Sequence, residues 1–401
     1  MSSSPPSLRE LPMASRLSPQ PPLVVNRSSD WRPTPDQRLL LEAALARDAS
    51  AGEAWRAWRR GKDPREHRWD AGSYRLLPAV YKNLSAHGLD DPFMGELRNV
   101  YQQSWFRNQA LLGKLARVID LLGAAGHETI VLKGAALVLR HHLGEVGVRP
   151  MEDVDVLVRT ERADDAWRLM VERGWRPAGL VASYPSHARV LIDDDGIACD
   201  LHRHVLRESG GPARDRVYWA GARPLSCLGR KTLALNPTDH LTHVCTHGAR
   251  WNYATASLRW IVDALTILRE DGAAIDWARL IEHARRDRPV AFALGFTLPY
   301  LRGEFGAGVP DEVIDGLARM EFTRVERRRW LRRMRSAAAM GPLERARFLV
   351  TDYRFVAPRG GPWRKLSGFV RYLQCVLRVE SPGQIPRRVL SGAMRQMAAR
   401  R

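Results

Sequence analysis

The chain of 401 residues carries a formal net charge of +19 and is long enough to bury the cores of about two or three domains. Its four widely spaced cysteines exclude a zinc ribbon and a disulfide framework, and they favour a reducing, cytoplasmic location. No stretch reaches the roughly 18 apolar residues of a membrane-spanning helix, and the N-terminus lacks the apolar run of a secretion signal.

The basic charge by itself does not identify a partner. Only six of the 63 basic residues are lysine, and arginine occurs in nearly every segment. We interpret this pattern as a compositional bias of the whole chain. The alternative is a surface that binds nucleic acid or membrane.

The first part of the chain predicts a leader followed by helices. Residues 1–35 are rich in serine, proline and arginine, which is typical of a disordered segment. Over residues 36–122, apolar residues recur at spacings of three and four. We therefore expect a helical N-terminal region that packs against the rest of the protein.

A mixed α/β core is predicted over residues 123–235. A short apolar strand over residues 130–132 ends at Lys133 and Gly134, and a helix follows. In the next strand, DVDVLV, Asp153 and Asp155 alternate with valines. Both carboxylates therefore face one side of the strand, while the valines enter a core.

Three further extended segments, RPAGLVAS, HARVLID and GIACDLHRHV, continue the core, so we expect a sheet of at least four strands. The DDDG turn from Asp193 to Gly196 joins the last two segments as a hairpin. Asp200 lies on the final strand of this set.

Helical patterns return after Lys231, and they predict a helical C-terminal domain over residues 236–358. Asn236 or Thr238 is expected to cap its first helix. His240, His243 and His247 share one face of that helix near Cys245, which also allows a zinc interpretation. We favour a helix packed against the site, because no separate pair of ligands with suitable spacing accompanies these histidines.

A basic tail over residues 359–401 contains the segment WRKLSGFVRYLQCVLRV. Its amphipathic pattern would also suit the surface of an anionic membrane. We expect it to pack against the body of the protein.

The carboxylates Asp153, Asp155 and Asp200 suggest a metal site. Hard anionic oxygens favour Mg²⁺ or Mn²⁺ over zinc. In nucleotidyl transfer such ions clamp the triphosphate and the attacking oxygen, and the third carboxylate is suited to take the proton of the nucleophile. Lys133 and Arg149 supply positive charge near the phosphates. Gly134 allows backbone amides at the start of a helix to approach them.

The segments LKGAA, RPMEDVDVLV and CDLHRH, in this order, resemble the uncharacterised nucleotidyltransferase family of the DNA polymerase beta superfamily. The phrases HLTHVCTHG and LRWIVDAL resemble the helical C-terminal part of that family, so the resemblance covers roughly residues 70 to 300. It implies metal ligands at Asp153 and Asp155 and a third carboxylate at Asp200. It also implies a phosphate-binding turn at Lys133 and Gly134.

Ala135 belongs to the same expected nucleotide-binding turn, at a position where most members of the wider superfamily have glycine or serine. Three further residues, His202, His247 and Asp263, are candidates for the border of the substrate pocket.

The sequence thus predicts an α+β protein in which a small mixed sheet forms a nucleotidyltransferase core between helical N-terminal and C-terminal regions. We expect transfer of a nucleoside monophosphate from a nucleoside triphosphate, dependent on Mg²⁺ or Mn²⁺, to an unknown hydroxyl acceptor. The acceptor is a small molecule, RNA or protein, and peripheral membrane contact is not expected. The alternative is a catalytically silent nucleotide-binding or scaffold protein on the same fold.

Overall fold

The computed structural model describes residues 32–178, 187–207, 211–248, 258–334, 340–356 and 361–377, together with 379, 381–389 and 391. Nearly all of the predicted leader and part of the third predicted strand segment lie outside the described residues. Within the described part, none of the helices is both long and apolar enough to cross a membrane.

The N-terminal region is helical, as predicted. Its first helix starts with a capping box, in which the Thr34 side chain accepts a hydrogen bond from the Gln37 amide and the Gln37 side chain accepts one from the Thr34 amide. The Trp55 and Trp58 rings stack with their centroids 5.4 Å apart in the core of the region. The helices are α1 (Pro35–Leu45), α2 (Ser50–Arg59), α3 (Ala71–Tyr74), α4 (Leu77–Ala86) and α5 (Met94–Ala124).

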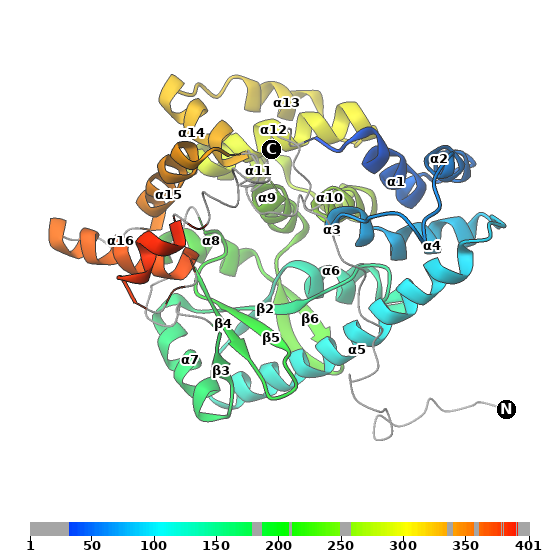
Figure 1. Ribbon diagram of the computed structural model, residues 1–401. Coiled ribbons are helices and arrows are strands. Elements are labelled where there is room, and N and C mark those ends of the chain that lie inside the picture. Colours follow the sequence, from blue (N-terminus) through cyan, green and yellow to red (C-terminus); the bar gives the residue numbers. More distant parts are fainter. Residues whose placement is uncertain are drawn as a thin grey trace.

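Helix α5 is 31 residues long and belongs to two parts of the molecule. It contacts α4 on one side, and its C-terminal half packs on the sheet. Leu111, Leu115 and Leu122 share a buried cluster with the valines of the second strand. Figure 1 shows α5 running beneath the sheet.

The centre of the molecule is a seven-stranded mixed sheet with the order β3-β4-β5-β2-β1-β7-β6. The pairs β2/β5 and β1/β7 are parallel, and the other neighbours are antiparallel. The predicted hairpin before Asp200 is confirmed as β4 and β5. The strands are β1 (Thr129–Val131), β2 (Asp153–Val158), β3 (Arg176–Pro177), β4 (Ala188–Ile192), β5 (Ala198–His202), β6 (Arg223–Cys227) and β7 (Arg230–Ala234).

The hairpin of β6 and β7 was not among the predicted strands. Most of its residues are exposed or half-buried, so it lacks the clean apolar alternation by which a strand is recognised. Leu228 and Gly229 form its two-residue turn with φ values of 47° and 82°. Positive φ at both positions suits the right-handed twist of the strands that they join.

The two faces of the sheet differ in chemistry. Val154, Val156 and Val158 are fully buried in a cluster with residues of α5 and α7 (Ala163–Glu172). Leu157 faces the other way and belongs to the larger cluster of the helical regions. The prediction that the valines of this strand enter a core is confirmed.

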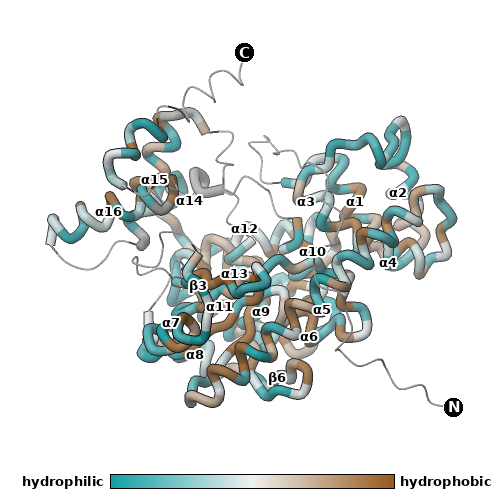
Figure 2. Tube along the Cα trace, turned by 60° about the horizontal axis from the view of Figure 1, so that its bottom comes forward, coloured by the Kyte–Doolittle hydropathy of each residue, from teal (hydrophilic) through white to brown (hydrophobic). Residues whose placement is uncertain are grey.

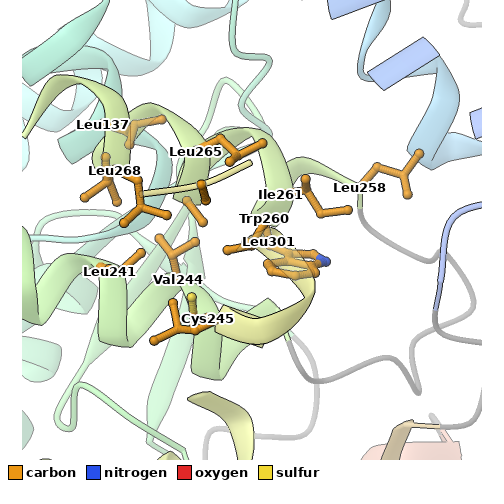
Figure 3. Close-up of a cluster of buried hydrophobic side chains, with 14 of the residues drawn as sticks. Leu137, Leu241, Val244, Cys245, Leu258, Trp260, Ile261, Leu265, Leu268 and Leu301 are labelled. Carbon is orange, nitrogen blue, oxygen red and sulfur yellow. The ribbon is translucent and has the colours of Figure 1, made fainter. Parts of the chain in front are cut away.

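Helix α6 (Lys133–His141) connects the sheet to the C-terminal helices. Leu137 packs with Leu241 and Val244 of α9 and with Leu265 and Leu268 of α10 (Figure 3). The remaining α-helices are α8 (Pro212–Gly221), α9 (Pro237–Gly248), α10 (Arg259–Glu270), α11 (Trp277–Arg286), α12 (Arg288–Phe305), α13 (Asp311–Ala318), α14 (Arg324–Met334), α15 (Pro342–Val356) and α16 (Pro362–Leu377).

Helices α14, α15 and α16 form a group that we call the C-terminal lobe (residues 324–391). Trp330 of α14 stacks on Phe292 of α12 and attaches this lobe to the main core. Figure 2 shows this lobe on the opposite side of the molecule from α1 to α4. Helix α16, which contains the predicted amphipathic segment, packs on α15 through Tyr353, Phe369 and Tyr372. This small cluster is distinct from the two main cores.

A buried polar network fixes α9. Asn236 caps the helix, because its side-chain oxygen accepts a hydrogen bond of 3.0 Å from the Asp239 amide. Asp239 is fully buried and accepts two hydrogen bonds, of 2.8 and 2.7 Å, from Arg279 of α11. His283 Nε2 lies 2.7 Å from the same carboxylate. The network therefore ties α9 to α11.

Replacing Asp239 with alanine should lower the free energy of unfolding by about 3 kcal/mol, because Arg279 and His283 lose their shared buried partner. Asp315→Ala, at an exposed position of α13, is the control and should change it by less than about 0.5 kcal/mol. Urea denaturation followed by circular dichroism measures both values. Equal values for the two variants would contradict a stabilising network.

Candidate active site

The carboxylates predicted on two strands meet on one face of the sheet. The parallel register of β2 and β5 sets Asp155 directly beside Asp200. Asp153 lies two residues before Asp155 on β2 and therefore shares its face. The opposite face carries the buried valines, so the alternation seen in the sequence separates the acidic face from the apolar one.

The closest group of metal-ligating atoms consists of Asp155, Asp200 and His202. One ligand atom from each lies within 4.8 Å of the others. His202 is buried, and its Nε2 lies 2.9 Å from Asp155 Oδ1. The set predicted from the sequence was the pair Asp153 and Asp155 with Asp200 as the third carboxylate, and His202 was placed at the border of the pocket. Among the described residues, the group within this distance includes His202 and does not include Asp153.

Asp153 and Asp200 both show the effect of crowded negative charge. Burial and the neighbouring Asp155 charge raise the pKa of Asp153 to about 6. The same two causes raise the pKa of Asp200. Two carboxyl groups on this face therefore favour an additional positive charge nearby.

Asp155 behaves in the opposite way. Burial alone would raise its pKa, but the Lys133 ammonium and the bond with His202 hold the pKa of Asp155 well below its ordinary value. Asp155 is therefore ionised, and its carboxylate binds both Lys133 and His202.

Lys133 begins α6 in the left-handed region, with a φ of 48°. For a residue with a Cβ this conformation costs roughly 1 to 2 kcal/mol. Its Nζ lies 2.5 Å from Asp155 Oδ1, at the N-terminal end of the helix. The sequence predicted a phosphate contact for this lysine, and in the structure its ammonium binds the central carboxylate.

Gly134 makes room for an arginine. A Cβ added at this position would lie 1.9 Å from Arg149 Nη1, so a side chain here would displace the guanidinium from its present position. Arg149 is in turn held by Asp263 of α10 through bonds of 3.0 Å from Nε and 2.7 Å from Nη2. The ion pair is largely buried and joins the sheet domain to the C-terminal helices.

Ala135 is buried on the apolar side of α6 and packs in the cluster that contains Val131 and Val154. Its side chain thus lies in the valine core, so a nucleotide could contact this residue only through its backbone.

Arg259, the first residue of α10, is a site residue that sequence reasoning missed. Its Nη1 donates a hydrogen bond of 2.9 Å to the carbonyl of Pro150, and its buried Nε has no hydrogen-bond partner among the described residues. Burial and the nearby Arg149 charge lower the pKa of Arg259 to about 10. Its position in the sequence could have indicated this role: Arg259 precedes Asp263 by four residues and therefore shares a helical face with it.

The histidines of α9 do not form a comparable group among the described residues. His240 is buried, and burial lowers its pKa to about 3, which is typical of a neutral packed side chain. His247 lies in the last turn of α9, with its ring 6.2 Å from that of His243. These positions agree with helix packing, the interpretation that the sequence favoured over zinc.

The model of the uncharacterised nucleotidyltransferase family matches residues 71–297, which is more than half of the chain. The chain belongs to this family. The match includes the whole acidic face, α6 and the Arg149–Asp263 ion pair, so the resemblance predicted from the sequence motifs is confirmed.

The chain is similar to an antigenic nucleotidyltransferase-like protein from Paracoccidioides brasiliensis, of which a crystal structure is known. The identity is 14%, the match covers 51% of this chain and 95% of that one, and the TM-score is 0.33. A search among curated proteins finds no match.

Replacing Gly134 with alanine should lower the free energy of unfolding by about 2 kcal/mol, because the new Cβ displaces the Arg149 guanidinium from its buried site. Gly113→Ala is the matched control, since this glycine also lies within a helix but has open space around it. The control should be neutral or stabilising by up to about 1 kcal/mol. Thermal unfolding compares the two, and an equally stable Gly134→Ala variant would contradict the contact with Arg149.

Proposed function

We propose that this protein transfers a nucleoside monophosphate from a nucleoside triphosphate to a hydroxyl group of an acceptor, with the help of Mg²⁺ or Mn²⁺. The observation that carries the proposal is the pairing of β2 with β5. It places Asp155 beside Asp200, with Asp153 on the same face. Membership in a nucleotidyltransferase family supports the same reaction class.

The donor set fits a divalent cation. Asp153, Asp155 and Asp200 offer hard oxygen ligands, which suit Mg²⁺ and Mn²⁺. The raised pKa values of Asp153 and Asp200 show that the protein alone leaves their negative charges poorly compensated. A bound divalent ion would supply positive charge that offsets the charge of the triphosphate and of the departing pyrophosphate.

The triphosphate would lie between the acidic face and a group of positive charges. The first backbone amides of α6, at Lys133 and Gly134, point their positive end toward this place. Arg149 lies beside the same turn, and the Arg259 charge acts on Asp153. Because Asp263 holds two nitrogens of Arg149, the guanidinium is oriented before the nucleotide arrives.

In the reaction, the acceptor oxygen would attack the α-phosphorus, the bond to the β-phosphate oxygen would break, and pyrophosphate would leave. Asp200 is suited to take the proton of the acceptor hydroxyl, because it is a carboxylate that lies on the strand beside Asp155. His202 keeps Asp155 in place through Nε2.

The acceptor would be a small molecule, an RNA end or a protein side chain with a free hydroxyl. We assign the protein to the cytoplasm on the basis of Cys199, Cys227 and Cys245, which are buried and unpaired.

Asp153→Asn and Asp155→Asn should each reduce nucleotidyl transfer by at least about a hundredfold, because each removes a charge that holds the metal ion at the triphosphate. The measurement uses nucleotides labelled at the α-phosphate, Mg²⁺ or Mn²⁺, and extracts that supply acceptors. Asp194→Asn is the control, since this aspartate is highly exposed on the turn between β4 and β5.

Undiminished labelling by both variants would overturn the assignment of the acidic face. Nucleotide binding without any transfer by the unaltered protein, with every acceptor pool, would instead identify a silent nucleotide-binding protein.

Arg259→Gln should raise the KM for the nucleoside triphosphate by about tenfold or more, because a charged hydrogen bond to phosphate is lost. Arg269→Gln is the matched control on the same helix, where Arg269 donates to the Leu45 carbonyl at the surface. Steady-state kinetics with varied nucleotide separates the two. Equal KM values would show that Arg259 supports the fold alone.

A further inference from the structure

The positive charge of the chain is concentrated in one part of the molecule. From residue 324 to the end, 20 lysines and arginines stand against four aspartates and glutamates, which accounts for +16 of the formal +19. Arginine is frequent throughout the chain, but acidic residues almost balance it before residue 324. The C-terminal lobe (residues 324–391) has 17 of these basic residues and all four acidic ones, so it carries +13 of the net charge.

The same lobe carries most of the exposed apolar side chains. In the described part of the chain, seven of the ten large hydrophobic residues that are exposed belong to it, although it is less than a fifth of the sequence. Trp363 is the extreme case, with 81% of its surface exposed. The other six are Val325, Leu343, Val350, Leu366, Val376 and Val389.

Helix α16 shows how the two properties combine. Its inner side, at Phe369 and Tyr372, packs on Tyr353 of α15, and the Tyr353 hydroxyl donates a hydrogen bond to the Lys365 carbonyl. Trp363 and Leu366 lie three residues apart, on one side of the first turns, and are left uncovered.

Exposed basic residues accompany this apolar pair. Arg364 and Lys365 lie between the two apolar residues in the sequence, and Arg371 follows two turns later. An exposed apolar edge bordered by basic side chains is the pattern of a helix that lies in the plane of a membrane interface.

We propose that the C-terminal lobe docks the protein on an anionic lipid surface, with Trp363 and Leu366 inserted at the level of the headgroups and the arginines paired with lipid phosphates. This inference goes beyond the proposed transfer reaction and does not depend on it. It also reverses the expectation from the sequence that the tail avoids membranes, because α16 packs on its neighbour and still leaves an apolar edge exposed.

The side chains favour lipid over the other polyanionic partners. Six of the seven exposed apolar residues are leucine or valine, which fit among acyl chains but offer no ring on which a nucleic-acid base can stack. A second copy of the chain is also disfavoured as the partner, because two lobes with a charge of +13 repel each other.

The test is co-sedimentation of the full-length protein with vesicles of phosphatidylcholine, pure or with about a third of phosphatidylglycerol. We expect binding to the anionic vesicles that is at least about tenfold stronger than to neutral ones and that weakens with salt. The double variant Trp363→Ala/Leu366→Ala should bind about tenfold more weakly. The double variant Arg364→Gln/Lys365→Gln should do the same.

Two control variants lie outside the lobe. Phe106→Ala/Leu143→Ala removes two exposed apolar side chains, and Arg98→Gln/Arg117→Gln removes two exposed charges from α5. Both should bind anionic vesicles as the unaltered protein does. A parallel titration with labelled single-stranded RNA tests the competing partner.

Three results would overturn the proposal. One is the absence of binding to anionic vesicles, with or without binding to RNA. Another is binding that the loss of Trp363 and Leu366 leaves unchanged, which would make the attraction purely electrostatic. The last is an equal loss of binding in the control variants. Nucleotide-transfer activity does not enter the measurement, so its outcome is independent of the proposed reaction.

Discussion

The ion pair between Arg149 and Asp263 is the interaction on which the candidate site depends. It joins the loop before β2 to α10, and so connects the sheet domain to the C-terminal helices at the point where α6 begins. The guanidinium is in contact with Gly134, and this contact dictates the residue type at the turn. A buried pair of this kind costs desolvation of both charges, which a bidentate geometry offsets. The contribution of the pair is therefore to fix the position of the guanidinium.

Charge compensation organises the rest of the site. Lys133 has an unfavourable, left-handed backbone conformation, and its ammonium stabilises the buried Asp155. Asp153 and Asp200 receive less compensation, as their raised pKa values show. Strain and uncompensated charge thus gather within one small region, while the valine face behind it is uniformly apolar. Backbone strain and uncompensated charge gathered in one region are typical of a functional site that a stable core supports.

Local sequence pattern predicted the parts of this architecture that follow from periodicity. The alternation in DVDVLV gave the strand, its two faces and the position of both aspartates, and the turn before Asp200 gave the neighbouring hairpin. The hairpin of β6 and β7 escaped because its exposed residues carry no such alternation. The sequence also did not predict three features of the site: the proximity of His202 to Asp155, the role of Gly134 and the presence of Arg259. Each of these depends on contacts between distant segments, which spacing along one segment does not encode.

The order of the strands has a consequence for how the chain folds as it is made. β1 lies in the interior of the sheet between β2 and β7, yet β7 is synthesised about a hundred residues later. Helix α5 is synthesised before β1 and β7. The side of α5 that packs on the sheet is therefore exposed until these strands have formed. Pairings of such long range make folding slow. The nascent protein therefore exposes an apolar side of α5 until these strands have been made, which is the kind of surface that chaperones bind.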